Sequence, residues 1–166
     1  MKRLLLSVGM VLFLTVGQAS ANILYTFSGV TFSDGGTLTG TFTTNDAINV
    51  LIGFDITTSA GAGIGFHYTP GTVGSSSTSL PFIIVLSTPT LDHLLQVTFG
   101  GAGLTALGAP ISIGTFASFE QGTASARRDI NAGSAIVATT VPEPSTIALL
   151  GMGVLGLLAS IRRRRG

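Results

Sequence analysis

The segment Phe32-Ser33-Asp34-Gly35-Gly36-Thr37-Leu38-Thr39-Gly40-Thr41-Phe42 decides the fold class of this chain. Asp-Gly-Gly is a strong turn signal, and after it Leu38, Gly40 and Phe42 alternate with threonines. A period of two is typical of a β-strand with one buried face, and threonine suits the outer face because β-branched side chains pack well on a pleated sheet. The segment therefore predicts a β-hairpin.

The same period continues on both sides of this hairpin. Ile23, Tyr25 and Phe27 alternate with polar or smaller residues before it. A second alternating series follows it and predicts a strand with these residues on one face: Val50, Ile52, Phe54 and Ile56. No stretch of the chain between its two apolar ends has a convincing helical period.

Further along the chain the signals become weaker. Residues 59–79 are rich in Gly, Ser, Thr and Pro, with Phe66-His67-Tyr68 in the middle, and predict a long loop or a very short strand between loops. Residues 80–87 form an apolar run of the right length for a strand buried on both faces. A third alternating series places these residues on one strand face: Ile111, Ile113, Thr115, Ala117 and Phe119. With strands also expected near 91–99 and 135–139, we predict an all-β fold of seven to nine strands, an antiparallel β-sandwich or a jelly-roll-like domain.

The N-terminus predicts a secretory signal peptide over residues 1–21. Met1-Lys2-Arg3 is basic, residues 4–16 are apolar, and Ala19 and Ala21 are the small residues that a signal peptidase inspects. We expect the secretion machinery to export the chain and signal peptidase to cut after Ala21. The alternative is an N-terminal anchor that stays uncut.

The C-terminus predicts a single transmembrane helix. An apolar, uncharged run over residues 147–161 ends at Arg162, Arg163, Arg164 and Arg165, and the predicted helix covers residues 145–161. A lone apolar segment can satisfy its backbone in lipid only as a helix, and 1.5 Å per residue gives a span of roughly 25 Å, slightly short of a bilayer core of roughly 30 Å. The four arginines act as a membrane stop and keep the C-terminus in the cytoplasm, so the preceding chain lies outside.

A stiff peptide precedes this helix. Pro142 and Pro144 fix their own φ angles and push Val141 and Glu143 toward extended geometry, which suits a protease cleft. The alternative is a simple helix start, because a proline at the first turn and a carboxylate beside the positive end of the helix dipole both favour helix formation.

The order of Pro142-Glu143-Pro144, short apolar helix and arginine cluster resembles the PEP-CTERM sorting signal of bacterial exosortase-dependent proteins. The resemblance covers residues 141–166. It implies that an exosortase, a membrane-integral transpeptidase, recognises Pro142, Glu143 and Pro144 and processes the chain nearby. It also implies a Gram-negative source that makes exopolysaccharide. The hairpin at residues 32–42 is similar to one common in such surface proteins.

Composition narrows the role of the exported β-rich domain, residues 22–140. It carries six carboxylates against Arg127 and Arg128, which leaves it about four units negative. Nucleic acid is therefore not expected as a partner, because phosphate binding needs a basic face. The chain has no cysteine, so disulfides and thiolate metal or redox sites are excluded.

Few residues could act as an acid, a base or a nucleophile, and we expect no catalytic, cofactor or metal site. His67 is expected at the surface, and His93 half-buried on the strand face of Leu91 and Leu95. A calcium site is an alternative for a group of oxygen-bearing residues, although turn chemistry explains them better: Asp34, Asn45, Asp46, Asn49 and Asp55. Arg127-Arg128 indicates a charged strand edge or a protease-sensitive pair.

The sequence therefore predicts a non-enzymatic cell-surface or extracellular-matrix protein, associated with exopolysaccharide and sorted by an exosortase. We expect the precursor to be anchored in the inner membrane until it is processed. The alternatives are a carbohydrate-binding or calcium-binding β-sandwich module and a secreted hydrolase. A hydrolase would need His67 or His93 beside an acid and a serine in one cleft.

Overall fold

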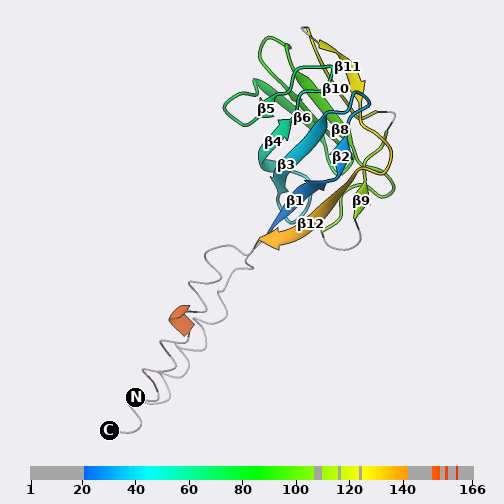
Figure 1. Cartoon of the computed structure of the whole chain (residues 1–166). Helices are drawn as coiled ribbons and strands as arrows, with labels where there is room; N and C mark the ends of the chain where they lie inside the picture. The colour runs from blue at the N-terminus through cyan, green and yellow to red at the C-terminus, as the bar shows by residue number, and fades with distance from the viewer. Residues whose placement is uncertain are drawn as a thin grey trace. The chain divides into compact units, whose positions relative to one another are not determined.

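The computed structural model describes residues 21–106, 110–115, 117–123 and 125–141, with residues 151–153, 156 and 160 of the C-terminal tail. Ala21–Val141 form one compact unit. This unit consists of antiparallel strands in two sheets (Figure 1). The prediction of an antiparallel, all-β domain is confirmed.

The first sheet has seven strands. Their bounds are β1 Asn22–Ser28, β2 Val30–Thr31, β3 Thr37–Thr44, β4 Leu51–Thr58, β5 His67–Tyr68, β9 Ile111–Ser112 and β12 Ala135–Val141. Their spatial order is β5-β4-β3-β1-β12-β9, and β2 also pairs with β3. The first and last strands of the domain are therefore neighbours near the middle of this sheet.

The second sheet has five strands. Their bounds are β6 Ser75–Ser79, β7 Ile83–Ser87, β8 Leu94–Thr98, β10 Phe119–Gly122 and β11 Ser125–Asp129, in the order β11-β10-β8-β7-β6. The described residues thus contain twelve strands where seven to nine were predicted. The additional strands are β2 and β5, with two residues each, the serine-rich β6, and β11, and the single series predicted over residues 111–119 is divided between β9 and β10.

The predicted hairpin at residues 32–42 is present. Val30 pairs with Leu38, and the turn is closed by a hydrogen bond from the Phe32 amide to the Gly36 carbonyl at 2.8 Å. Asp34 Oδ1 accepts a hydrogen bond from the Gly36 amide at 3.0 Å. The side chain thus bonds to the backbone two residues later, which is why Asp favours turns.

One hydrophobic core lies between the two sheets. The Tyr25 and Phe42 rings of the first sheet stack with centroids 4.8 Å apart, and Phe42 also meets Phe99, which follows β8 in the second sheet, at 5.7 Å. The second sheet buries these aliphatic residues in the same cluster: Ile84, Leu86, Leu95 and Val97. The core therefore joins residues from both sheets in a single cluster.

The segment at residues 59–87 differs from its prediction. β5 is the very short strand that was the alternative to a loop, but the serine-rich β6 was not expected; its five residues are all exposed and pair only with β7. An edge strand can be held by backbone hydrogen bonds alone, so it needs no apolar residues. In β7, Ile84, Leu86 and Ser87 are buried while Ile83 and Val85 are half-buried, so the predicted burial on both faces is only partial on the second face.

The alternating series in β4 is interrupted by a β-bulge. Thr43 pairs with Gly53 but Thr44 pairs with Leu51, which leaves Ile52 as an extra residue. A bulge shifts the side-chain phase of a strand. Ile56 is accordingly buried, whereas Val50 and Ile52 are each 52% exposed. The expectation that all four apolar residues share one face was wrong.

The third alternating series also fails, at its end. Phe119 is half-buried, and its neighbour Glu120 points into the core with 2% exposure. The chain between Ile113 and Phe119 leaves the first sheet and enters the second, so the period is not continuous across it. The inward residue of β10 is consequently a carboxylate.

Candidate functional site

The two ends of the domain meet in one strand pair. β1 and β12 run antiparallel in unbroken register, from Asn22 opposite Val141 to Ser28 opposite Ala135. Figure 1 shows the start of β1 (blue) and the tip of β12 (orange) at the same end of the domain. Asn22 is the first residue after the predicted signal-peptidase cut, and Val141 directly precedes Pro142. The two predicted processing positions therefore flank adjacent strand ends.

The predicted signal residues lie almost entirely outside the described residues. Ala21 is half-buried just before β1. The signal residues outside the described part are Ala19, Pro142, Glu143, Pro144, Arg162, Arg163, Arg164 and Arg165. Of the helix predicted over 145–161, the described residues 151–153, 156 and 160 are helical. Within the described part of the chain, no helix is long and apolar enough to cross a membrane.

Comparison with protein families identifies this end of the chain. Residues 140–165 match the model of the PEP-CTERM protein-sorting motif. The chain carries a PEP-CTERM motif. Such a motif implies an exported, surface-directed protein that is processed by an exosortase. No curated protein and no solved structure matches this PEP-CTERM chain.

The PEP-CTERM match begins inside the folded domain. Its first two residues, Thr140 and Val141, are also the last two residues of β12, where they pair with Ile23 and Asn22. The matched range includes the predicted Pro-Glu-Pro residues and all four arginines. No spacer therefore separates the last strand from the Pro-Glu-Pro sequence.

The two histidines do not assemble a hydrolase site in the described residues. His67 lies in β5, where its Nε2 is 2.7 Å from Asp55 Oδ1, and both side chains are more than half exposed. His93 precedes β8, rather than lying in a strand with Leu91, and its ring stacks on Phe66 with centroids 4.2 Å apart. No serine hydroxyl in the described part of the chain hydrogen-bonds to either imidazole ring.

A buried ionic network is the main feature that sequence reasoning missed. Glu120 Oε1 accepts hydrogen bonds from Tyr68 at 2.6 Å and Thr58 at 2.9 Å, so β10 is joined to both β5 and β4 across the core. Glu120 Oε2 accepts from Arg128 Nε at 2.8 Å, and a second guanidinium nitrogen of Arg128 also bonds to it. Arg128 is 4% exposed.

Arg128 extends this network to the hairpin turn. Its Nη1 donates to the Ser59 carbonyl at 2.9 Å and to Asp34 Oδ2 at 3.3 Å, and its guanidinium lies 4.3 Å from the Phe32 ring centroid. Buried charges are tolerated only when they are paired and hydrogen-bonded, as here. The prediction of a charged edge or a protease-sensitive pair was therefore wrong for Arg128.

The network shifts two pKa values. Burial and the adjacent Glu120 carboxylate both raise the pKa of the Tyr68 phenol. Partial burial would raise the pKa of Asp34 too, but hydrogen bonds from the Gly63 and Gly36 amides and the Arg128 charge outweigh it and hold that pKa below its ordinary value. Tyr68 thus stays neutral and Asp34 stays ionised, which is the arrangement that the network requires.

The oxygen-bearing residues weighed for calcium serve the turns. Asn45 Oδ1 accepts from the Asn49 amide at 3.0 Å and from the Val50 amide at 3.1 Å. Asp34 accepts hydrogen bonds from the Gly36 and Gly63 amides and from Arg128. Asp55 pairs with His67. Within the described residues no cluster of three or more potential metal-binding side chains occurs. Turn chemistry accounts for Asp34 and Asn45.

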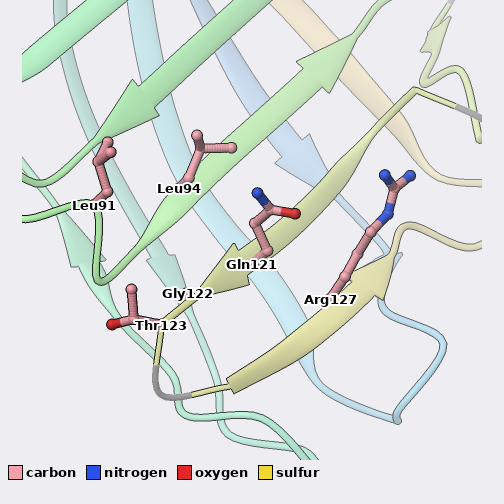
Figure 2. A pocket seen from close by; sticks show the side chains of 6 residues that line it. All are labelled: Leu91, Leu94, Gln121, Gly122, Thr123 and Arg127. Atoms are coloured by element: carbon pink, nitrogen blue, oxygen red, sulfur yellow. The ribbon is translucent and has the colours of Figure 1, made fainter.

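A shallow hollow of about 440 Å³ lies over β8, β10 and β11 (Figure 2). It is lined by Leu91, Leu94, Gln121, Gly122, Thr123 and Arg127. Arg127 is held in place at one side, since its guanidinium lies 3.9 Å from the Phe119 centroid and its Nε donates to Asp129 at 2.8 Å. Leucine side chains, an amide, a hydroxyl and a cation thus share one exposed surface.

Proposed function

We propose that this protein is a non-enzymatic component of the cell surface or extracellular matrix. A signal peptide exports it, its C-terminal helix holds the precursor in the inner membrane, and an exosortase processes it near Pro142-Glu143-Pro144. The mature β-sandwich then associates with exopolysaccharide. The observation that carries this proposal is the PEP-CTERM match at residues 140–165, which begins at the end of a folded β-domain.

The character of the domain supports a structural role. Its main ionic network is buried and joins β4, β5, β10, β11 and the turn at Asp34, so these charges stabilise the fold instead of meeting a ligand. The exposed hydroxyl-bearing residues include all five residues of β6 and two threonines of β3, Thr37 and Thr39, whose hydroxyls also bond to Ser59 and to the Thr57 carbonyl. A stable domain with a hydroxyl-rich face suits a hydrated polysaccharide matrix.

The sorting step is tested with two variants of the full chain in a strain that encodes an exosortase. We expect Glu143→Ala to leave the C-terminal tail attached to the chain and deletion of residues 147–166 to leave the chain without its anchor, so that neither variant yields the processed form in the surface fraction. Asp92→Ala serves as the matched control, because it removes an exposed carboxylate outside the matched range. Unchanged processing and localisation of both test variants would contradict the proposal.

A carbohydrate-binding role is the second candidate, and the hollow of Figure 2 favours it. Gln121, Thr123 and Arg127 offer hydrogen-bonding groups beside the apolar surfaces of Leu91 and Leu94. Sugars present both hydroxyl groups and apolar ring faces, so such a mixed surface suits them. Binding to a glycan array that is lost in Gln121→Ala would support this role, and an array without any signal would remove it.

A further inference from the structure

The β3–β4 hairpin tip lies at the same end of the domain as the two processing positions. Ile23 of β1 pairs with Thr44, the last residue of β3, while Asn22 pairs with Val141. The amide of Asn45 donates to the Val50 carbonyl at 3.2 Å, which continues the β3–β4 ladder past Thr44. The tip, residues 45–50, therefore extends from the same end of the sheet as the end of β12, with β1 between β3 and β12.

This end of the domain displays apolar side chains. Val50 and Ile52 are each 52% exposed, and Val141 is 42% exposed. Single exposed hydrophobic residues are common on soluble proteins and need no explanation. Val50 and Ile52 lie at the β4 side and Val141 on β12, with β3 and β1 between them, and all three lie at the end of the sheet where the chain continues into an apolar tail. We refer to Val50, Ile52 and Val141 as the apolar end patch.

The hairpin tip is also held in one conformation. The side chain of Asn45 accepts hydrogen bonds from the Asn49 and Val50 amides through Oδ1. Its Nδ2 also donates to Asn49 Oδ1 at 2.7 Å. Ile48 has a positive φ of 52° and packs against the core. An isoleucine in this region is strained, so the surrounding contacts must fix it. The apolar side chains next to the tip are thus presented on a preorganised turn.

We propose that the apolar end patch contacts the lipid bilayer while the C-terminal tail is uncut. This inference rests on the proposed function, which places the tail in the membrane. Only Pro142, Glu143 and Pro144 separate Val141 from the predicted helix at residue 145. At about 3.5 Å per residue, the chain can span no more than about 14 Å between these points. In this proposal the short connection keeps this end of the domain near the lipid headgroups.

The contact is apolar and not electrostatic. The hairpin tip carries one exposed charge, Asp46, and the only two arginines of the exported domain lie on β11 in the other sheet. A patch of three aliphatic side chains binds a bilayer weakly alone, but tethering raises its effective concentration at the surface. Exosortase cleavage removes the tether, so the same patch allows the mature domain to leave.

The absence of cysteine permits a direct test by site-specific labelling. We would introduce Val50→Cys, Ile52→Cys or, as the control, Ser28→Cys into the full chain. Ser28 is exposed at the opposite end of the β1–β12 pair. Each variant is labelled with nitrobenzoxadiazole and reconstituted into bilayers of phosphatidylethanolamine, with or without phosphatidylglycerol.

Labels at 50 and 52 should emit at shorter wavelength in bilayers than the label at 28, and lipid-borne doxyl groups should quench them. The label at 28 should remain accessible to aqueous iodide. Because the contact is apolar, omitting phosphatidylglycerol should leave the shifts unchanged. Adding Val141→Ser to the Ile52→Cys variant should reduce the shift at 52, whereas adding Thr139→Ser should leave it unchanged.

The outcomes separate this inference from the sorting proposal. If alkaline extraction leaves the chain in the bilayer but labels at 50 and 52 are as water-accessible as the label at 28, the inference is overturned and sorting stands. If the chain is extracted, both the anchored precursor and the inference are overturned. A shift that appears only in bilayers containing an exosortase would also overturn it, because the patch would then dock on protein.

Discussion

Arg127 and Arg128 are adjacent and chemically identical, but they differ in burial and therefore in their contribution to stability. Arg127 and Arg128 each lie over a phenylalanine ring and each bind a carboxylate. The side chain of Arg127 is 46% exposed and that of Arg128 is 4% exposed. Exposed ion pairs contribute little to stability because water and salt screen them, whereas breaking a buried pair leaves an unpaired charge in the core. Substitution of Arg128 should therefore lower the free energy of unfolding more than substitution of Arg127.

We expect Arg128→Met to destabilise residues 22–141 by about 3–5 kcal/mol, because Glu120 and Asp34 would lose their shared cation. The free energy of unfolding in urea, followed by circular dichroism, measures this loss. Arg127→Met is the matched control and should cost no more than about 1 kcal/mol. Equal losses in the two variants would contradict the role given to the buried network.

Asp34 should make the domain sensitive to acid. Its pKa is lowered in the folded state, so its contribution is present above the unfolded pKa of 3.8 and is lost as the pH falls through the folded pKa. Urea unfolding at a series of pH values should show stability falling below about pH 4. Asp34→Asn should be less stable at neutral pH and show a flatter acid dependence. A parallel curve for the variant would show that other carboxylates govern acid unfolding.

β3 and β4 approach each other so closely at Gly40 that a larger residue there should destabilise the domain. Gly40 has a φ of 113°, and a β-carbon there would lie 2.1 Å from the Asp55 carbonyl oxygen. Gly40→Ala should therefore cost about 2–4 kcal/mol by thermal or urea unfolding. Gly53→Ala, on β4, is the control, because no atom lies within 4 Å of its added β-carbon. Similar stability of the two variants would contradict this geometry.

The strands that sequence reasoning found were those with a continuous apolar period and a clear turn. The residues 32–42 hairpin was predicted because Asp34 and the glycines after it fix a turn that the backbone also requires. β6 was missed because a serine strand held only through backbone pairing at a sheet edge has no apolar period. The bulge at Ile52 was missed because the sequence alternation continues through it.

The candidate functional residues also divide into those with a local sequence signal and those brought together only by the fold. Local signals such as the Pro-Glu-Pro tail can be recognised from a contiguous sequence, and the family match agrees with that prediction. The partners of Glu120 come from β4, β5 and β11, and pairing across two sheets leaves no local pattern. One signal was available: the alternation of a strand places Arg128 on the opposite face from Arg127 and Asp129.

The whole domain should resist alkaline titration of its two tyrosines until it unfolds. Tyr25 and Tyr68 are both fully buried, and burial raises the pKa of each. Their contribution to stability is present below the unfolded pKa of about 10 and is lost as the pH rises above it. Phenolate absorbance should therefore rise only together with the loss of the circular dichroism signal. Ionisation of one tyrosine in the folded protein would contradict this burial.

The pairing of the first strand with the last also governs when the domain can form during secretion. The Thr139 hydroxyl donates to the Leu24 carbonyl across 115 residues of sequence. β1 crosses the membrane first, and it can pair with β3 early, but its other edge stays open until almost the entire domain has been translocated. A chain that ends before residue 135 therefore leaves the β12-binding edge of β1 unpaired, which favours aggregation and proteolysis.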